Sequence, residues 1–327
     1  MRIGIFLAYW PWFTPEEQVE LAVLADRSGL DSVWVSEAWG QDAVSLLGFL
    51  AARTERVALG SGVLQIPARK PTATAMAAVT LDVLSHGRFR LGLGLSGPQV
   101  SEGWYGVPFG RGLGRTREYV DVVRRALARE PIALPLEDGP ALGLGKPLKL
   151  LAKPVSDPVP IYLGATGPKA IAQCAEIADG WMPFAISPAV VGEITPPDDR
   201  PFDVAPALPV AVAGDVESAR DAVRPWLAFY FGAMGAPQKN FYVELADRHG
   251  HGDAAREAQR RYLEGDRAGA AAALTHELID AASIACVEGD LADRVAVYRE
   301  AGATSLVAVP CGDRVATVEA LARVAAA

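Results

Sequence analysis

Short apolar segments alternate with longer amphipathic segments along most of the chain, and this alternation constrains the fold more than any other feature. The short segments are apolar without a polar alternation, which is typical of parallel strands buried on both faces. We expect strands at Arg2–Leu7, Ser32–Val35, Val57–Val63, Phe89–Gly94, Ile161–Leu163, Trp181–Pro183, Ala207–Val212 and Ser305–Val309. Eight strands that each lead into a helix predict an α/β fold, a closed TIM-type (β/α)8 barrel rather than an open doubly wound sheet.

Helix start signals follow the early strands. Thr14, Pro15 and Glu17 form a capping pattern, and apolar residues follow at helical spacing. The other helices expected in the first half are Ala43–Arg53, Thr72–Leu84 and Arg115–Leu127.

Two stretches exceed the minimal β/α unit. Residues 131–158 contain several prolines and the segment LGLGKPLKLL, which predicts an excursion of loop and short strands before the fifth strand. Residues 218–281 contain several helical patterns, which predicts a helical insertion between strands seven and eight. No linker or low-complexity tract divides the chain, so residues 1–327 are expected to form one domain.

Composition and charge exclude several classes of protein. Half of the residues are hydrophobic and 21% are charged, which is typical of a globular chain. The net charge of -8 argues against a nucleic-acid partner, which would require a basic surface. No apolar run reaches the roughly 18 residues of a membrane span, so no membrane partner is expected. Three scattered cysteines predict a reducing, cytoplasmic environment.

The segment GLGLSG follows the fourth expected strand and formally matches a dinucleotide-binding fingerprint through Gly92, Gly94 and Gly97. That fingerprint requires a helix to open at once, so that its amide dipole meets the pyrophosphate. Because Pro98 and further glycines follow, we expect no helix before about Arg115. We therefore interpret the glycines as small residues at the crowded mouth of a barrel strand.

Eight segments, most of them at these strand ends, carry a family pattern. They are VWVSEAWG at 33–40, ALGSGVLQIPARKP at 58–71, LDVLSHGRFRLGLGLSGP at 81–98, EGWYGVPF at 102–109, RTREYV at 115–120, IYLGATGPK at 161–169, AEIADGWMP at 175–183 and GAMGAPQKNFY at 232–242. In this order they resemble the bacterial luciferase-like monooxygenase superfamily. Within it they are similar to the reductases that use the deazaflavin coenzyme F420, such as the methylenetetrahydromethanopterin reductases. The resemblance implies a TIM-type barrel with the cofactor at its C-terminal mouth, and we expect a homodimer.

The resemblance also implies which residues bind the cofactor. Gly62–Val63 is expected to hold a non-proline cis peptide bond behind the central ring. The loop Gly164–Lys169 is expected to hold the cofactor phosphate, because its small residues admit a ligand and proline at a helix start leaves amides exposed. The full expected set is Glu37, Gly62, Val63, Leu64, Gln65, Arg69, Leu95, Ser96, Gly97, Gly164, Ala165, Thr166, Gly167, Pro168 and Lys169.

Glu37 at the end of the second strand is the expected catalytic residue. In an apolar mouth beside Trp39, desolvation would keep part of this carboxyl group protonated, and it would donate a proton during hydride transfer. Ala38 follows where the related sugar-phosphate dehydrogenases carry a histidine. The loss of that base favours reduction over alcohol oxidation.

Aromatic residues gather on the loops after the strands and are expected to wall a pocket for a flat, apolar substrate. These residues are Trp10, Trp12, Phe13, Trp39, Trp104 and Tyr105. His249 and His251 lack a third ligand nearby, so no metal site is expected.

Three functions remain open from the sequence. The first is an F420-dependent oxidoreductase that moves a hydride between the deazaflavin and a C=C or C=N bond of a small organic substrate. The second is an FMN-dependent monooxygenase of the same fold. The third is a barrel that binds a flavin-like ligand without turnover.

Overall fold

The structure is a computed structural model that describes residues 1–10, 12–135 and 142–327. All eight expected strands are present among these residues. Four of them have the expected bounds: β1 (Arg2–Leu7), β2 (Ser32–Val35), β5 (Phe89–Gly94) and β6 (Ile161–Leu163). The other four differ at their ends: β3 (Ala58–Ser61), β7 (Gly180–Trp181), β9 (Ala207–Ala213) and β11 (Ser305–Pro310).

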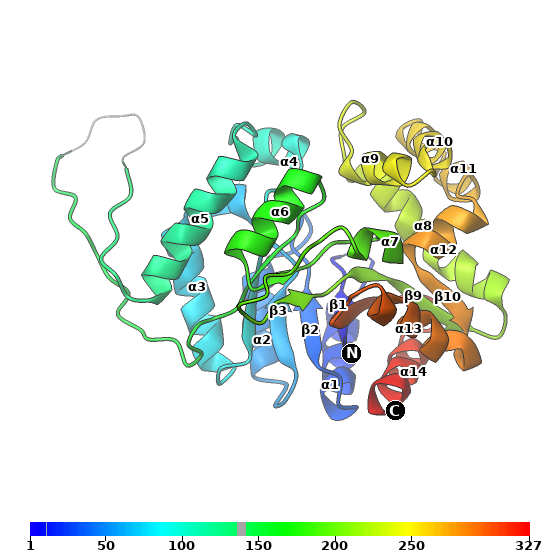
Figure 1. Ribbon diagram of the computed structural model, residues 1–327, viewed down its shortest axis with the longest axis horizontal. Helices are drawn as coiled ribbons and strands as arrows, with labels where there is room; N and C mark the ends of the chain where they lie inside the picture. Colours follow the sequence, from blue (N-terminus) through cyan, green and yellow to red (C-terminus); the bar gives the residue numbers. More distant parts are fainter. Residues whose placement is uncertain (11, 136–141) are drawn as a thin grey trace.

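The strands form one curled sheet in which every named pair is parallel. β1 lies between β11 and β2, and the order continues through β3, β5, β6 and β7 to β8 (Asp203–Val204). β8 leads directly into β9, which pairs with β11, and Phe184 bridges to Ala207. The two ends of the sheet therefore meet, and the TIM-type α/β fold is confirmed (Figure 1).

Helices cover the outside of the sheet (Figure 1). α1 (Pro15–Arg27) begins with the expected capping box, in which the Thr14 hydroxyl accepts from the Glu17 amide and the Glu17 carboxylate accepts from the Thr14 amide. The remaining helices around the sheet are α2 (Ala43–Ala51), α3 (Pro71–Leu84), α5 (Gly112–Leu127), α6 (Pro168–Ile177), α13 (Leu291–Glu300) and α14 (Arg314–Ala326).

The expectation that no helix begins before Arg115 is wrong. α4 (Pro98–Gly103) begins directly after Gly97, and α5 begins at Gly112. Proline is well suited to the first helical position, because its fixed φ matches the helix and its missing N–H is not needed there. The helix has only six residues and follows a barrel strand, so GLGLSG does not form a Rossmann unit.

The two long stretches also depart from the simple pattern. In residues 131–158, a single bridge between Ile132 and Leu148 is present in the described part, and 136–141 lie outside it. Beyond β9 the chain forms α8 (Val216–Ala233), α9 (Phe241–Arg248), α10 (Gly252–Leu263), α11 (Arg267–Ala272) and α12 (His276–Ala282). These helices lead into β10 (Ile284–Val287), a strand the sequence did not predict, which pairs with β9 before α13 and β11 complete the barrel.

A buried carboxylate fixes the N-terminal end of the barrel, opposite the expected site. Asp203 accepts hydrogen bonds from the Tyr162 hydroxyl at 2.9 Å and the Ser305 hydroxyl at 2.8 Å, and its carboxylate lies 2.8 Å from the Arg2 guanidinium. These contacts join β1, β6, β8 and β11. Across the described ranges, none of the helices has the length and apolarity needed to cross a bilayer.

Candidate active site

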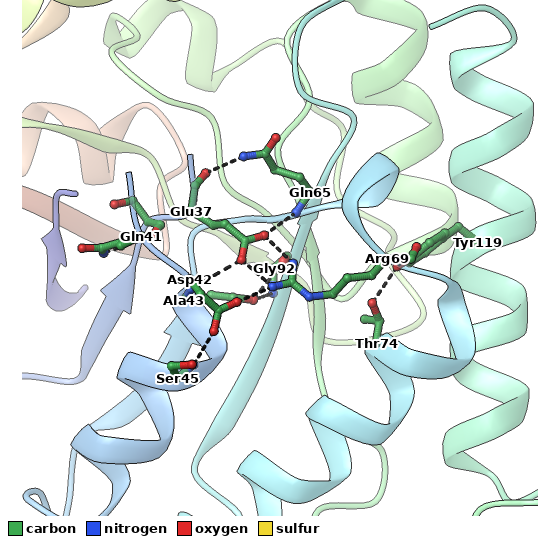
Figure 2. A network of polar contacts seen from close by, with 12 residues as sticks. Glu37, Gln41, Asp42, Ala43, Ser45, Gln65, Arg69, Thr74, Gly92 and Tyr119 are labelled. Carbon is green, nitrogen blue, oxygen red and sulfur yellow. Dashed lines mark hydrogen bonds and ion pairs between the residues drawn. The ribbon is translucent and has the colours of Figure 1, made fainter. Parts of the chain in front are cut away.

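An ion pair between Glu37 and Arg69 occupies the C-terminal ends of the second and third barrel strands (Figure 2). The guanidinium contacts both carboxylate oxygens, at 2.5 and 2.6 Å, and also reaches the Asp42 carboxylate at 2.6 Å. A bidentate pair of this kind fixes both side chains in one orientation. Arg69 reaches back to Glu37 because the 3₁₀ turn Ile66–Ala68 reverses the chain after β4 (Leu64–Gln65).

The backbone supplies the rest of the Glu37 environment. The carboxylate accepts the amide N–H of Gln65 at 3.1 Å and that of Ala43 at 3.4 Å. The Gln65 side-chain amide in turn donates to the Glu37 carbonyl at 3.0 Å. The Glu37 side chain is 4% exposed, whereas Trp39 is 45% exposed. The expected apolar surroundings beside Trp39 are therefore wrong, because a guanidinium and two backbone amides contact this carboxyl group.

The negative charges of Glu37 and Asp42 shift the pKa values of nearby side chains. Burial alone would lower the pKa of the Arg69 guanidinium, but the hydrogen bonds and charge of Glu37, with Asp42, raise it above its ordinary value. Burial raises the pKa of the Tyr105 hydroxyl, and the negative charge of Glu37 raises it further. Tyr105 is therefore a neutral hydroxyl close to an ion pair.

The expected cis peptide bond between Gly62 and Val63 is present and is confirmed. A side chain at position 62 has no room, because a Cβ there would lie 2.5 Å from the Phe6 ring. Val63 in turn lies over β5, where a Cβ on Gly94 would come within 2.5 Å of its methyl group. Phe6 and Gly94 thus border the bulge on two sides.

Two buried amide oxygens, one in β4 and one in α4, lack a partner among the described residues. The Oε1 atoms of Gln65 and Gln99 are inaccessible and accept no hydrogen bond from the described residues. Leaving a buried acceptor unpaired costs about 1–3 kcal/mol, so each of these atoms would be stabilised by a donor from outside the described residues. Gln65 belongs to the expected site, whereas Gln99, in the first turn of α4, was missed because no motif pointed to it.

The loop after β6 opens toward a helix N-terminus, as expected for Gly164–Lys169. α6 begins at Pro168 with Gly167 as its N-cap, and a Cβ on Gly167 would meet no atom within 4 Å. Lys169 is exposed. Arg248 at the end of α9 donates to the Thr166 carbonyl at 2.9 Å, a contact that sequence reasoning missed because 82 residues separate the two.

The remaining expected cofactor residues divide into packed and accessible positions. Leu64 and Ala165 are buried, and the Ala165 carbonyl accepts from the Trp181 indole at 2.8 Å. Ser96 has a φ of 62°, and Leu95 and Gly97 beside it are partly exposed. The structure thus places Leu95–Gly97 at the strand end and makes Leu64 part of the barrel core.

The six expected pocket aromatics do not act as one wall. Trp12 packs edge-on against Trp226, with ring centroids 5.1 Å apart, and Phe13 is buried beneath the Arg314 guanidinium at 4.2 Å. Trp12 remains partly exposed, so its place in the pocket stays a prediction, whereas the buried ring of Phe13 lies beneath a residue of α14. Trp10, Trp39 and Trp104 are exposed, and Tyr105 is half-buried.

A different group of aromatic side chains joins the mouth to the helices after β9. Phe184 follows β7, and its ring lies 5.9 Å from Phe6, which packs on the bulge. Tyr230 of α8 stacks on Phe184 at 4.2 Å, and Tyr242 of α9 meets both rings edge-on. Sequence reasoning named none of these three rings as a site residue, because they come from three segments that are distant in the chain.

Comparison with known proteins agrees with this geometry. Residues 1–305 match the model of the family described as luciferase-like monooxygenase. The chain belongs to this family. Across the described residues of this luciferase-like protein, no group of three or more potential metal ligands forms, and His249 pairs with Glu193 at 3.0 Å instead.

Relatives and structures refine the position of this luciferase-like chain. It is 41% identical to a Mycobacterium tuberculosis protein named provisionally as a coenzyme F420-dependent oxidoreductase, over 94% of each chain. It is 31% identical to the 5,10-methylenetetrahydromethanopterin reductase of Archaeoglobus fulgidus, over 94% of this chain and 93% of that one. The coenzyme F420-dependent tetrahydromethanopterin reductase of Methanopyrus kandleri shares the fold, with a TM-score of 0.83 at 23% identity over 98% and 97% of the two chains.

Proposed function

We propose that this protein is an F420-dependent oxidoreductase that transfers a hydride between the deazaflavin and a C=C or C=N bond of a small organic substrate. The observation that carries the proposal is the mouth of the barrel, where the buried Oε1 of Gln65 has no partner among the described residues and the N-terminus of α6 is open at Gly167. The 41% identity to a protein named for F420 supports this cofactor over FMN. Ala38 in place of a histidine supports reduction.

The residues at the mouth fit this cofactor. The bulge would back the ring, and the amide oxygens of Gln65 and Gln99 would accept hydrogen bonds from its N–H groups. The open space at Gly167, the first amides of α6 and Lys169 would hold the phosphate. When bound, F420 accepts or donates a hydride at its ring and does not activate oxygen as a flavin does.

Glu37 has a positioning role in this proposal. Its side chain accepts four hydrogen bonds, two of them from Arg69, so both of its oxygens are engaged by donors of the protein. It fixes the backbone of Gln65, whose side chain would meet the cofactor. The proton that accompanies hydride transfer would come from Tyr105, whose raised pKa keeps its hydroxyl protonated, or from solvent.

Glu37→Gln is therefore expected to weaken F420 binding roughly 10-fold or more, through loss of hydrogen bonds to a charged group. We expect kcat to fall less than the roughly 100-fold or more that loss of a general acid causes. The affinity for F420 is measured by fluorescence titration. The pH profile of kcat is measured with an enone or imine that the wild-type protein reduces. A kcat loss above 100-fold at unchanged affinity would restore Glu37 as the proton donor.

Two measurements distinguish the proposal from an FMN-dependent monooxygenase and from a barrel that binds without turnover. They are the relative affinities for F420 and FMN, and the turnover of reduced F420. We expect the purified protein to bind F420 at least tenfold more tightly than FMN in a fluorescence titration. Tighter binding of FMN would favour the luciferase-like monooxygenase. Tight F420 binding, with no oxidation of reduced F420 by any of a panel of enones and imines, would favour a barrel that binds without turnover.

A further inference from the structure

A buried tyrosine contacts the main chain of Arg69. Tyr119 lies in the middle of α5, within the segment RTREYV at 115–120, and is 6% exposed. Its hydroxyl donates to the Arg69 carbonyl at 3.1 Å, and its oxygen lies 2.6 Å from the hydroxyl oxygen of Thr74, a fully buried residue of α3. Tyr119 therefore joins α5 both to α3 and to the residue that pairs with Glu37.

The direction of these hydrogen bonds follows from the donors present. A tyrosine hydroxyl has a single proton and the Arg69 carbonyl only accepts, so Tyr119 donates to Arg69 and the Thr74 hydroxyl donates to Tyr119. Burial raises the pKa of the Tyr119 hydroxyl to about 12, so this proton is retained at neutral pH. Replacement of Tyr119 by phenylalanine would leave the Arg69 carbonyl without this donor.

Arg69 is held at both of its ends. Its main chain lies between the 3₁₀ turn Ile66–Ala68 and the start of α3, outside the helices and strands, with φ -142° and ψ 148°. In Figure 2, Tyr119 lies at the main-chain end of Arg69, and the two carboxylates that Arg69 contacts lie at its guanidinium end. The hydrogen bond from Tyr119 thus restrains a residue that no helix or strand holds.

The position of Arg69 affects the proposed cofactor site through Glu37. The guanidinium contacts both Glu37 oxygens, at 2.5 and 2.6 Å, and the same carboxylate accepts the Gln65 amide at 3.1 Å. Successive contacts therefore connect Tyr119 to Gln65, whose buried Oε1 has no partner among the described residues. A displacement of Arg69 would move the residue that is expected to meet the cofactor.

We propose that Tyr119 is a positioning residue of the active site. Its hydroxyl fixes the main chain of Arg69, and the ion pair transmits this restraint to Glu37 and Gln65. A buried network whose members are hydrogen-bonded to one another favours a single arrangement of all of them. Tyr119 acts in this way without touching the cofactor, and its effect on cofactor binding rests on the proposed function.

A double-mutant cycle on F420 affinity tests the proposal. Tyr119→Phe is expected to weaken F420 binding roughly fivefold, the effect of one hydrogen bond. In the Glu37→Gln protein, where the guanidinium has already lost Glu37 as a charged partner, adding Tyr119→Phe is expected to change the affinity less than about twofold. A purely structural role, joining α5 to α3, predicts the same factor in both backgrounds. Equal factors, or no effect of Tyr119→Phe in the wild-type background, would overturn the proposal.

Tyr298→Phe is the matched control. Tyr298 of α13 is 3% exposed, and its hydroxyl also donates to a main-chain carbonyl, that of Ile186, at 3.0 Å. We expect both tyrosine variants to lower Tm by a similar amount, because each loses one hydrogen bond to a main-chain carbonyl. Only Tyr119→Phe is expected to change the affinity for F420. An equal loss of affinity in Tyr298→Phe would show that general destabilisation causes the effect, which contradicts a positioning role.

A measurement without cofactor separates this proposal from the proposed function. The guanidinium proton signals of Arg69, assigned by NMR through their loss in Arg69→Met, are followed in the cofactor-free protein. Their exchange with solvent is expected to be roughly tenfold faster in Tyr119→Phe and unchanged in Tyr298→Phe, because a loosened main chain opens the ion pair more often. Unchanged exchange in Tyr119→Phe would refute the positioning role. Faster exchange in a protein that does not bind F420 would keep that role and overturn the proposed function instead.

Discussion

Arg69→Met is expected to lower the free energy of unfolding by about 3 kcal/mol, at the lower end of what breaking a buried ion pair costs. The Glu37 side chain is 4% exposed and would remain as a buried carboxylate without its cation. The amides of Gln65 and Ala43 would still donate to it, which limits the loss. Urea denaturation followed by circular dichroism measures the change in the free energy of unfolding.

Two further variants make this result specific. Arg117 pairs with Glu176 at 2.5 Å, but both side chains are about half exposed, so Arg117→Met is expected to leave the free energy of unfolding almost unchanged. The double variant Glu37→Gln/Arg69→Met is expected to be more stable than Arg69→Met alone, because no charge remains buried without a partner. An Arg69→Met protein within about 1 kcal/mol of wild type would mean that water reaches and solvates Glu37.

The strand ends could be predicted from the sequence because each barrel strand is a short apolar run followed by small or polar residues. These strand ends alone predict that Glu37, Gln65 and Arg69 lie on neighbouring loops. Their pairing could not be predicted, because the orientation of Arg69 depends on the 3₁₀ turn at Ile66–Ala68. As a result, a residue expected to donate a proton in apolar surroundings lies in an ion pair.

Other parts of the site depend on contacts between distant segments. Phe184 and Tyr230 are 46 residues apart in the chain and stack only because α8 folds back over the end of β7. Trp12 and Phe13 follow the first strand, as pocket residues would, yet Trp12 packs on Trp226 of α8 and Phe13 lies beneath Arg314 of α14. Local patterns identify which loops reach the mouth of a barrel, but not which aromatic rings the later helices bury.

Gly167→Leu is expected to weaken F420 binding on the order of 100-fold while Tm stays within a few degrees of wild type. The fold tolerates the side chain, because Gly167 has a φ of -100°, which any residue adopts, and its Cβ position is open. The same open space lies in front of the first amides of α6, where an anion would be stabilised by the helix dipole. A leucine side chain there would occupy the space of the phosphate. It would offer no hydrogen-bond donor in place of the amides that it blocks.

The loss is measured by fluorescence titration with F420 and, in parallel, with the phosphate-free deazariboflavin part of the cofactor, whose affinity we expect to remain within threefold of wild type. Gly289→Leu serves as the matched control, because its Cβ position is also open and it lies in the turn after β10, outside the proposed site. F420 affinity within threefold of wild type for Gly167→Leu would show that the phosphate is held elsewhere. Equal losses for F420 and the phosphate-free part would instead indicate that the loop contacts the ring.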